Sequence, residues 1–133
     1  MKSKALGNLG VAQLLINKQD VHSCTASIHC SYYAVFQYMK YMLAHTDKSP
    51  ISYDAQSKQT EKASSHEYII CEIEHRISKL KNARSFAQDA RALKNCRVNA
   101  DYSTKIFNVD ESLDCKQQAD RLISKLKTYF GDK

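Results

Sequence analysis

One stretch of 27 residues, from Asp20 to Thr46, contains neither glycine nor proline and constrains the fold more than any other part of the chain. Its inward positions alternate in spacing between three and four, at Val21, Thr25, Ile28, Tyr32, Val35, Met39 and Met42. This spacing places one continuous stripe along a helix. Asp20 is expected to cap the helix, because an aspartate side chain accepts hydrogen bonds from first-turn amides. Such a helix spans roughly 39 Å, so other helices must pack along it.

The remaining periodic segments predict an all-α protein. Helical spacing of apolar residues indicates helices over 5–18, 66–81, 83–100 and 110–130, the first being the shortest. The first would bury Leu6, Leu9, Ala12 and Ile16, and the stripe of the second extends from His66 to Leu80. Ser64 and Asn108 each precede a glutamate by three residues, as N-caps do, and Gly131 is expected to end the last helix. We therefore expect a single domain over residues 1–133, an up-and-down four-helix bundle with an additional short helix.

The connections are less sharply defined by the pattern. Residues 47–65 are polar, contain the only proline and lack apolar periodicity, so we expect a mobile loop there. The pattern leaves open whether the helical run over 66–100 bends or divides at Asn82. Residues 101–109 are predicted to connect the last two helices.

Composition restricts the class of protein. No run of 18 apolar residues suggests a membrane span, and glycine and asparagine interrupt the N-terminal segment in a way that argues against a signal peptide. The five cysteines are odd in number, widely spaced and without a CxxC pair. This favours free thiols over a disulfide scaffold or a zinc site. We therefore expect a cytoplasmic protein with no metal and no cofactor.

Positive charge is concentrated in one segment. Residues 75–97 hold seven basic residues and one acidic residue, a net charge of +6 that equals the net charge of the whole chain. Such a segment attracts phosphate-bearing partners, but it also fits a solvated helix face. Within it, Arg97 occupies the inward phase set by Phe86 and Leu93. Because an unpaired buried charge is costly, its guanidinium either reaches water at the helix end or contacts an anion such as a phosphate.

Two short motifs lie on the predicted helices. The run SIHCSYYAVF, from Ser27 to Phe36, resembles the YYA-aromatic signature on a long helix of the HEPN domain family. The run CRVNADY, from Cys96 to Tyr102, resembles its R-x-x-ADY segment, which belongs to relatives of the HepT-like toxins. The order of the helices and motifs also matches, so the resemblance covers nearly the whole chain. It implies a helical bundle that forms a homodimer through the face bearing the motifs.

The resemblance also implies a function. Many HEPN domains are endoribonucleases, often toxins paired with a nucleotidyltransferase-type antitoxin, and their signature is an arginine followed after four to six residues by a histidine. Arg97 matches the arginine, but no histidine follows His75, and Tyr102 stands where the histidine would be. A phenol with a reference pKa near 10 is a poor base at neutral pH, whereas imidazole is well suited. Arg97 and Tyr102 are therefore the candidate catalytic residues of an incomplete motif.

Other candidates surround the two motifs. His29, Tyr32, Tyr33, Asn99 and Asp101 are the expected binding residues. His29 is close to the YYA motif, so folding can bring an imidazole to Arg97. Exposed tyrosines at this place would suit stacking on a base or a subunit interface.

Three functions are open at this point. The leading hypothesis is a homodimeric HEPN-like protein that binds nucleotide or RNA without full catalytic competence. The second is an endoribonuclease toxin in which Tyr102 or His29 replaces the missing histidine. The third is a protein-interaction module that binds a separately encoded nucleotidyltransferase. The basic segment favours the first two hypotheses, and the incomplete motif counts against the second.

Overall fold

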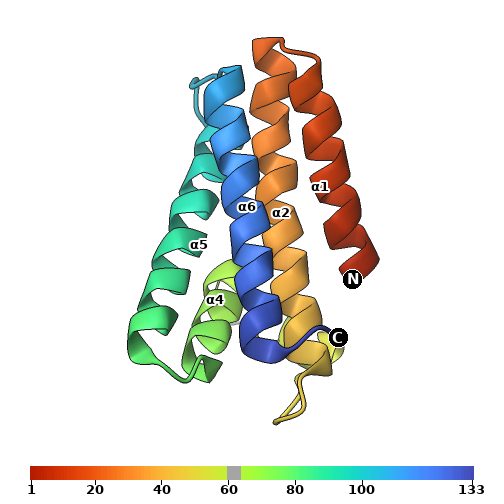
Figure 1. Cartoon of the computed structure of the whole chain (residues 1–133), viewed down its shortest axis with the longest axis vertical. Helices are drawn as coiled ribbons and strands as arrows, with labels where there is room; N and C mark the ends of the chain where they lie inside the picture. Colours follow the sequence, from red (N-terminus) through yellow and green to blue (C-terminus); the bar gives the residue numbers. More distant parts are fainter. Residues whose placement is uncertain (60–63) are drawn as a thin grey trace.

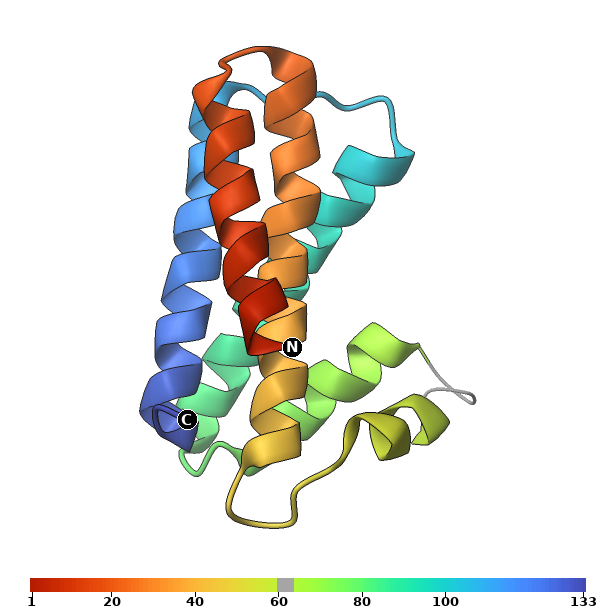
Figure 2. The ribbon, with the colours of Figure 1, turned by 90° about the vertical axis from the view of Figure 1, so that its right-hand side faces the viewer.

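The computed structural model describes residues 1–59 and 64–133, which form six α-helices and no strand. Four long helices, α1 (Lys2–Asn17), α2 (Val21–His45), α5 (Leu80–Tyr102) and α6 (Val109–Phe130), run up and down along the molecule (Figure 1). Two shorter helices, α3 (Tyr53–Gln59) and α4 (Ser65–Arg76), lie beside the C-terminal part of α2 (Figure 2). The expected all-α bundle is confirmed, with α3 as an addition.

The long helix α2 is the centre of the bundle and contacts each of the other five helices. The Asp20 carboxylate accepts a 2.8 Å hydrogen bond from the backbone N–H of Ser23, so the predicted cap is confirmed. The predicted stripe is buried at Ile28, Tyr32, Val35, Met39 and Met42. Val21, in the first turn, is exposed, and Thr25 is half-buried.

The second half of the chain divides at Ile77 to Lys79 and not at Asn82, which lies inside α5. Ile77 leaves the helical region and is buried, so the chain turns there and α5 runs back along the bundle. The predicted stripe is buried at Ile69, Ile70, Ile73 and Ile77, but its last residue is wrong, since Leu80 begins α5 and is 64% exposed. Lys79 caps α5 without a side-chain hydrogen bond. The sequence therefore carries no capping signal for this boundary.

The end of α5 also differs from the prediction. The helix continues to Tyr102, so the ADY residues form its last turn and the connection is confined to 103–108. As a result, Arg97 and Asp101 lie four positions apart on one helix face. The predicted start of α6 is confirmed, because Asn108 and Glu111 form a reciprocal capping box.

The predicted loop over 47–65 contains α3, which corrects the expectation of an unstructured segment. Ser52 accepts a 3.2 Å hydrogen bond from the backbone N–H of Ala55 at the start of this helix. Gln56 is only 1% exposed, and its Nε2 donates to the carbonyl oxygens of Lys40 and Ile51. A single buried amide anchors this polar helix, so no apolar periodicity marks it. Residues 60–63, which belong to the same predicted loop, lie outside the described residues.

The first helix packs through most of the predicted face. Ala12 and Ile16 are buried and Leu9 packs half-buried against the core, whereas Leu6 is exposed and Ala5 is buried instead. Leu14 is 65% exposed, so α1 has apolar side chains on both faces and its periodicity is weak. Helix α1 begins at Lys2, earlier than the predicted start at residue 5. The Lys2 ammonium donates a 2.6 Å hydrogen bond to the carbonyl of Lys133, which joins the two ends of the chain.

All five cysteines are free thiols in the structure. The described parts of the chain contain no cluster of three or more side chains suited to hold a metal ion. Within those parts, no helix combines the length and the apolar character needed to cross a membrane.

Candidate functional site

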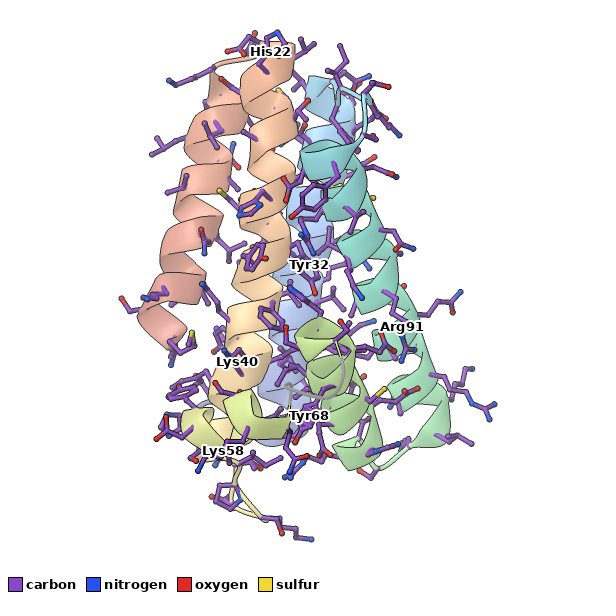
Figure 3. The ribbon with its side chains drawn as sticks, turned by 180° about the vertical axis from the view of Figure 1, so that it is seen from behind. His22, Tyr32, Lys40, Lys58, Tyr68 and Arg91 are labelled. Atoms are coloured by element: carbon purple, nitrogen blue, oxygen red, sulfur yellow. The ribbon has the colours of Figure 1, made fainter. Side chains whose placement is uncertain are left out.

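The two motifs meet in the folded chain. The YYA motif lies in the middle of α2, the ADY motif ends α5, and α4 packs against both of these helices. Figure 3 shows Tyr32 on the side of α2 that faces α5 and α4. We refer to His29, Tyr32, Tyr33, His66, Arg97, Asp101 and Tyr102 together as the Arg97 cluster.

Arg97 is at the centre of this cluster and is only 6% exposed. Its guanidinium carbon lies 5.3, 5.5 and 5.9 Å from the ring centres of Tyr32, Tyr33 and Tyr102. Such distances allow favourable cation–π interactions. The guanidinium therefore does not extend to water at the helix end, which was one of the two alternatives.

The polar contacts of Arg97 are few for a buried arginine. Its Nη1 lies 3.6 Å from Oδ2 of Asp101, an ion pair that is too long for a hydrogen bond. Its Nε is buried without a hydrogen-bond partner. A guanidinium has five N–H donors, and buried donors are normally bonded. The Arg97 guanidinium thus has one charged partner, Asp101, and three aromatic neighbours, but its Nε–H donor is unused.

His29 reaches the same carboxylate from α2. Its Nδ1 lies 2.8 Å from Oδ2 of Asp101, and its side chain is 49% exposed. An ionised carboxylate only accepts hydrogen bonds, so Nδ1 is the donor. In the neutral ring, Nε2 then carries the free lone pair. The ring centre of His29 also lies 4.5 Å from that of Tyr33, so the imidazole packs against a second member of the cluster.

A second histidine, His66 on α4, contacts Tyr32. The Tyr32 hydroxyl and His66 Nδ1 are 2.8 Å apart, and the His66 ring stacks at 4.2 Å on Phe36. Burial lowers the pKa of His66 to about 4, and the positive charges of Arg97, Lys94 and Lys40 add to this effect. Burial also raises the pKa of Tyr32. Both groups are therefore neutral at pH 7, Tyr32 is the donor, and the His66 proton is on Nε2.

The predicted site residues separate into two groups. His29, Tyr32, Tyr33 and Asp101 contact Arg97 or one another. Tyr102 is 78% exposed and covers the guanidinium from the solvent side. Asn99 is exposed and its side chain makes no described contact with the cluster. Residues two apart on a helix point in nearly opposite directions, so Asn99 and Arg97 face different sides.

One residue of the cluster, His66, was not predicted as a site residue, and neither was Phe36, on which its ring stacks. The sequence placed His66 on the apolar stripe of its helix, next to the capping Ser64, which gave no functional signal. Its partner Tyr32 is 34 positions away along the chain. Only the packing of α4 against α2 brings them together.

A small pocket lies directly beside this second histidine. Its volume is about 200 Å³, and its lining includes Phe36, Lys40, Gln56 and Ser65. The Lys40 ammonium also lies 5.6 Å from the Phe36 ring centre. The pocket adjoins the Arg97 cluster only through Phe36, on which the His66 ring stacks, and the Lys40 ammonium gives it a positive charge.

The basic segment is not one uniform charged surface. Arg91 pairs with Glu67 at 2.6 Å, and Lys94 lies 3.9 Å from the same carboxylate. Arg76 donates to the carbonyl oxygens of Lys48 and Ser49. Among the described residues, Lys79, Lys81 and Arg84 make no ion pair, and they lie at the opposite end of α5 from Arg97. Much of the positive charge near the cluster is thus balanced locally.

Comparisons of the chain with protein-family models, with curated proteins and with solved structures give no match. The functional argument therefore depends on the chemistry of the Arg97 cluster and on the two motifs.

Proposed function

We propose that this protein is a HEPN-like helical bundle that binds RNA or a nucleotide, with the Arg97 cluster as the phosphate site. The observation that carries the proposal is the state of Arg97. It is 6% exposed and its Nε has no hydrogen-bond partner. A phosphate offers several acceptor oxygens, and the planar guanidinium matches them better than an ammonium would.

The residues around Arg97 support a nucleic-acid ligand over a simple inorganic anion. Tyr102 is exposed and lies against the guanidinium, so its ring can move or stack on a base without disturbing the core. Stacking of a base on an aromatic side chain contributes about 1–3 kcal/mol and depends little on sequence. We therefore expect single-stranded RNA to bind better than phosphate alone.

A second candidate function is endoribonuclease activity, and the His29–Asp101 pair favours it. Asp101 orients the imidazole so that Nε2 is free to accept a proton. An imidazole at this place can take the proton of a ribose 2′-hydroxyl while its oxygen attacks the adjacent phosphorus. Arg97 would stabilise the charge that develops on the phosphate. In this arrangement His29, from another helix, replaces the histidine that is missing from the motif.

The replacement Arg97→Ala tests the binding proposal. A charged hydrogen bond contributes about 1.5–3 kcal/mol, so we expect the affinity for single-stranded RNA to fall roughly 10- to 150-fold. Arg97→Lys should recover only part of this loss, because an ammonium cannot reproduce the planar fork. Fluorescence anisotropy with a labelled oligoribonucleotide measures the affinity, and the melting temperature is recorded for the same variants.

Arg84→Ala is the matched control, since Arg84 lies on the same helix, is exposed and makes no ion pair within the described residues. It should change RNA affinity only slightly. Equal losses in the Arg84 and Arg97 variants would indicate diffuse attraction by the basic segment instead of a site. If Arg97→Ala lowers the melting temperature sharply and leaves binding unchanged, Arg97 is a structural partner of Asp101 and the proposed function fails.

A further inference from the structure

Two cysteines meet where α5 packs against α6. Cys96 belongs to α5 and Cys115 to α6, two helices that pack side by side (Figure 1). Their thiols are hydrogen-bonded to each other, and both are free. The pair is thus in contact although 19 positions separate its members along the chain.

The pair is accessible to small molecules. Both cysteines line a shallow surface hollow of about 370 Å³, together with Asp114, Gln118 and Arg121. Cys96 is half-buried and Cys115 is nearly buried. A small oxidant can therefore reach Cys96 first.

The two thiols differ in acidity. The hydrogen bond from Cys115 lowers the pKa of Cys96, and the nearby Lys105 ammonium adds to the effect, while burial and the Glu111 carboxylate oppose it. The same hydrogen bond raises the pKa of Cys115, with further contributions from burial and from the carboxylates of Asp114 and Glu111. Cys96 is therefore the more acidic thiol of the pair and the one that more readily forms a thiolate. A reactive cysteine requires this thiolate form.

We propose that Cys96 and Cys115 form a peroxide-sensitive dithiol that closes to a disulfide between α5 and α6. The Cys96 thiolate attacks one oxygen of hydrogen peroxide, the O–O bond breaks, and hydroxide leaves to give a sulfenic acid on Cys96. Cys115 then attacks the sulfenic sulfur and loses its proton, and a second hydroxide leaves and is protonated to water. In total, two thiols and one peroxide give one disulfide and two waters.

The remaining cysteines are poorer candidates for this reaction. Burial raises the pKa of Cys30 and of Cys71, which keeps both thiols protonated. Cys24 is completely buried. For none of the three is a disulfide or a hydrogen bond to another cysteine described. Oxidation should therefore be selective for the Cys96–Cys115 pair.

The disulfide would act on the end of α5 that carries the Arg97 cluster. Cys96 directly precedes Arg97, and Asp101 and Tyr102 follow within the next two turns. A covalent link to α6 would fix these turns against the bundle. The proposal does not depend on the proposed RNA binding, since oxidation is measured on the thiols themselves.

Alkylation and mass spectrometry test the proposal on the full chain. The reduced protein, denatured and treated with iodoacetamide, has five cysteines to label. After exposure to stoichiometric hydrogen peroxide, we expect two labels to be lost, and dithiothreitol to restore both. Peptide mapping should identify one linked pair that contains Cys96 and Cys115. Retention of all five labels, or a loss located at other cysteines, would overturn the proposal.

Three variants separate the two chemical steps. Cys96→Ser should abolish peroxide-dependent loss of label, and Cys115→Ser should stop the reaction at a sulfenic acid that dimedone traps on Cys96. Cys30→Ser, the matched control, should form the disulfide as the unchanged chain does. Dimedone labelling of Cys30 or Cys71 in place of Cys96 would contradict the assigned order of reactivity.

Discussion

His29 on α2 and Asp101 on α5 are joined by a 2.8 Å contact between Nδ1 and Oδ2, across 72 positions of sequence. The same carboxylate oxygen lies 3.6 Å from Nη1 of Arg97. One oxygen atom therefore orients an imidazole and partly balances a buried guanidinium. Binding and proton transfer are expected to depend on Asp101 in opposite ways, which allows the two candidate functions to be separated.

Asp101→Asn removes this negative charge while keeping the size of the side chain. We expect RNA affinity to be retained or to rise a few-fold, because a carboxylate beside a phosphate site opposes binding of an anion. If the protein cleaves RNA, the rate should fall by about 10²-fold, since His29 loses the charged, acceptor-only partner that sets its tautomer. Anisotropy and a gel-based cleavage assay on the same oligoribonucleotide measure the two quantities.

Asp132→Asn is the control for charge alone, because Asp132 is exposed in the C-terminal segment. It should affect neither quantity. If Asp101→Asn weakens RNA binding strongly, the carboxylate supports the ligand site instead of opposing it, and the assigned role of Asp101 is wrong.

The assembly of the chain gives a second prediction. The resemblance to HEPN domains implies a homodimer through the motif face, and α1 adds a second exposed apolar surface around Leu14. Light scattering at micromolar concentration should give about twice the chain mass of 15.2 kDa. Tyr102→Ala should weaken a dimer formed through the motif face, whereas Leu14→Lys should weaken one formed through α1. A single-chain mass over the whole concentration range would exclude a stable dimer.

Most of the fold follows from periodicity and capping. The stripe of α2, the Asp20 cap and the Asn108–Glu111 capping box were predicted because each is a local signal that tertiary packing leaves unchanged. The break at Ile77 was missed because no capping side chain or glycine marks it. The helix α3 was missed because it is held by the buried amide of Gln56 and not by an apolar stripe.

The candidate site was predictable only in part. The inward phase of Arg97 and the position of Tyr32 on the stripe are periodic properties, so the sequence identifies them. The contacts of His29 with Asp101 and of Tyr32 with His66 join different helices and are set by tertiary packing. Helical spacing relates only neighbours within one element, so it cannot select such partners.

Replacing Gly10 tests the packing of α1. Gly10 lies on the exposed face in mid-helix, and a Cβ added there would meet nothing within 4 Å. Gly10→Ala should therefore stabilise the protein by about 0.5–1 kcal/mol, because alanine loses less backbone entropy on folding. Urea unfolding measures the change. Gly131→Ala is a control of opposite sign: the positive φ of 90° at Gly131 strains any other residue and should cost about 1 kcal/mol. Destabilisation by Gly10→Ala would indicate that this face is covered by a partner.

The neutral state of His66 predicts a loss of stability in acid. Its pKa is lowered from 6.5 to about 4 in the folded chain. Between these values the unfolded chain binds the proton and the folded chain does not, so the free energy of unfolding falls as the pH falls through this window. Full stability is present above pH 6.5, and the loss by pH 4 is on the order of 2 kcal/mol.

His66→Gln keeps an acceptor for the Tyr32 hydroxyl but cannot be protonated. The variant should therefore lose less stability than the unchanged chain when urea unfolding is compared at pH 7 and near pH 4. His75→Gln is the matched control, because His75 is exposed near the end of the same helix and no hydrogen bond of its ring is described. It should retain the full acid dependence. If His66→Gln and His75→Gln lose stability in parallel with the unchanged chain, His66 is not the group whose protonation opposes folding. Its burial between Tyr32 and Phe36 is then not the cause of the loss of stability in acid.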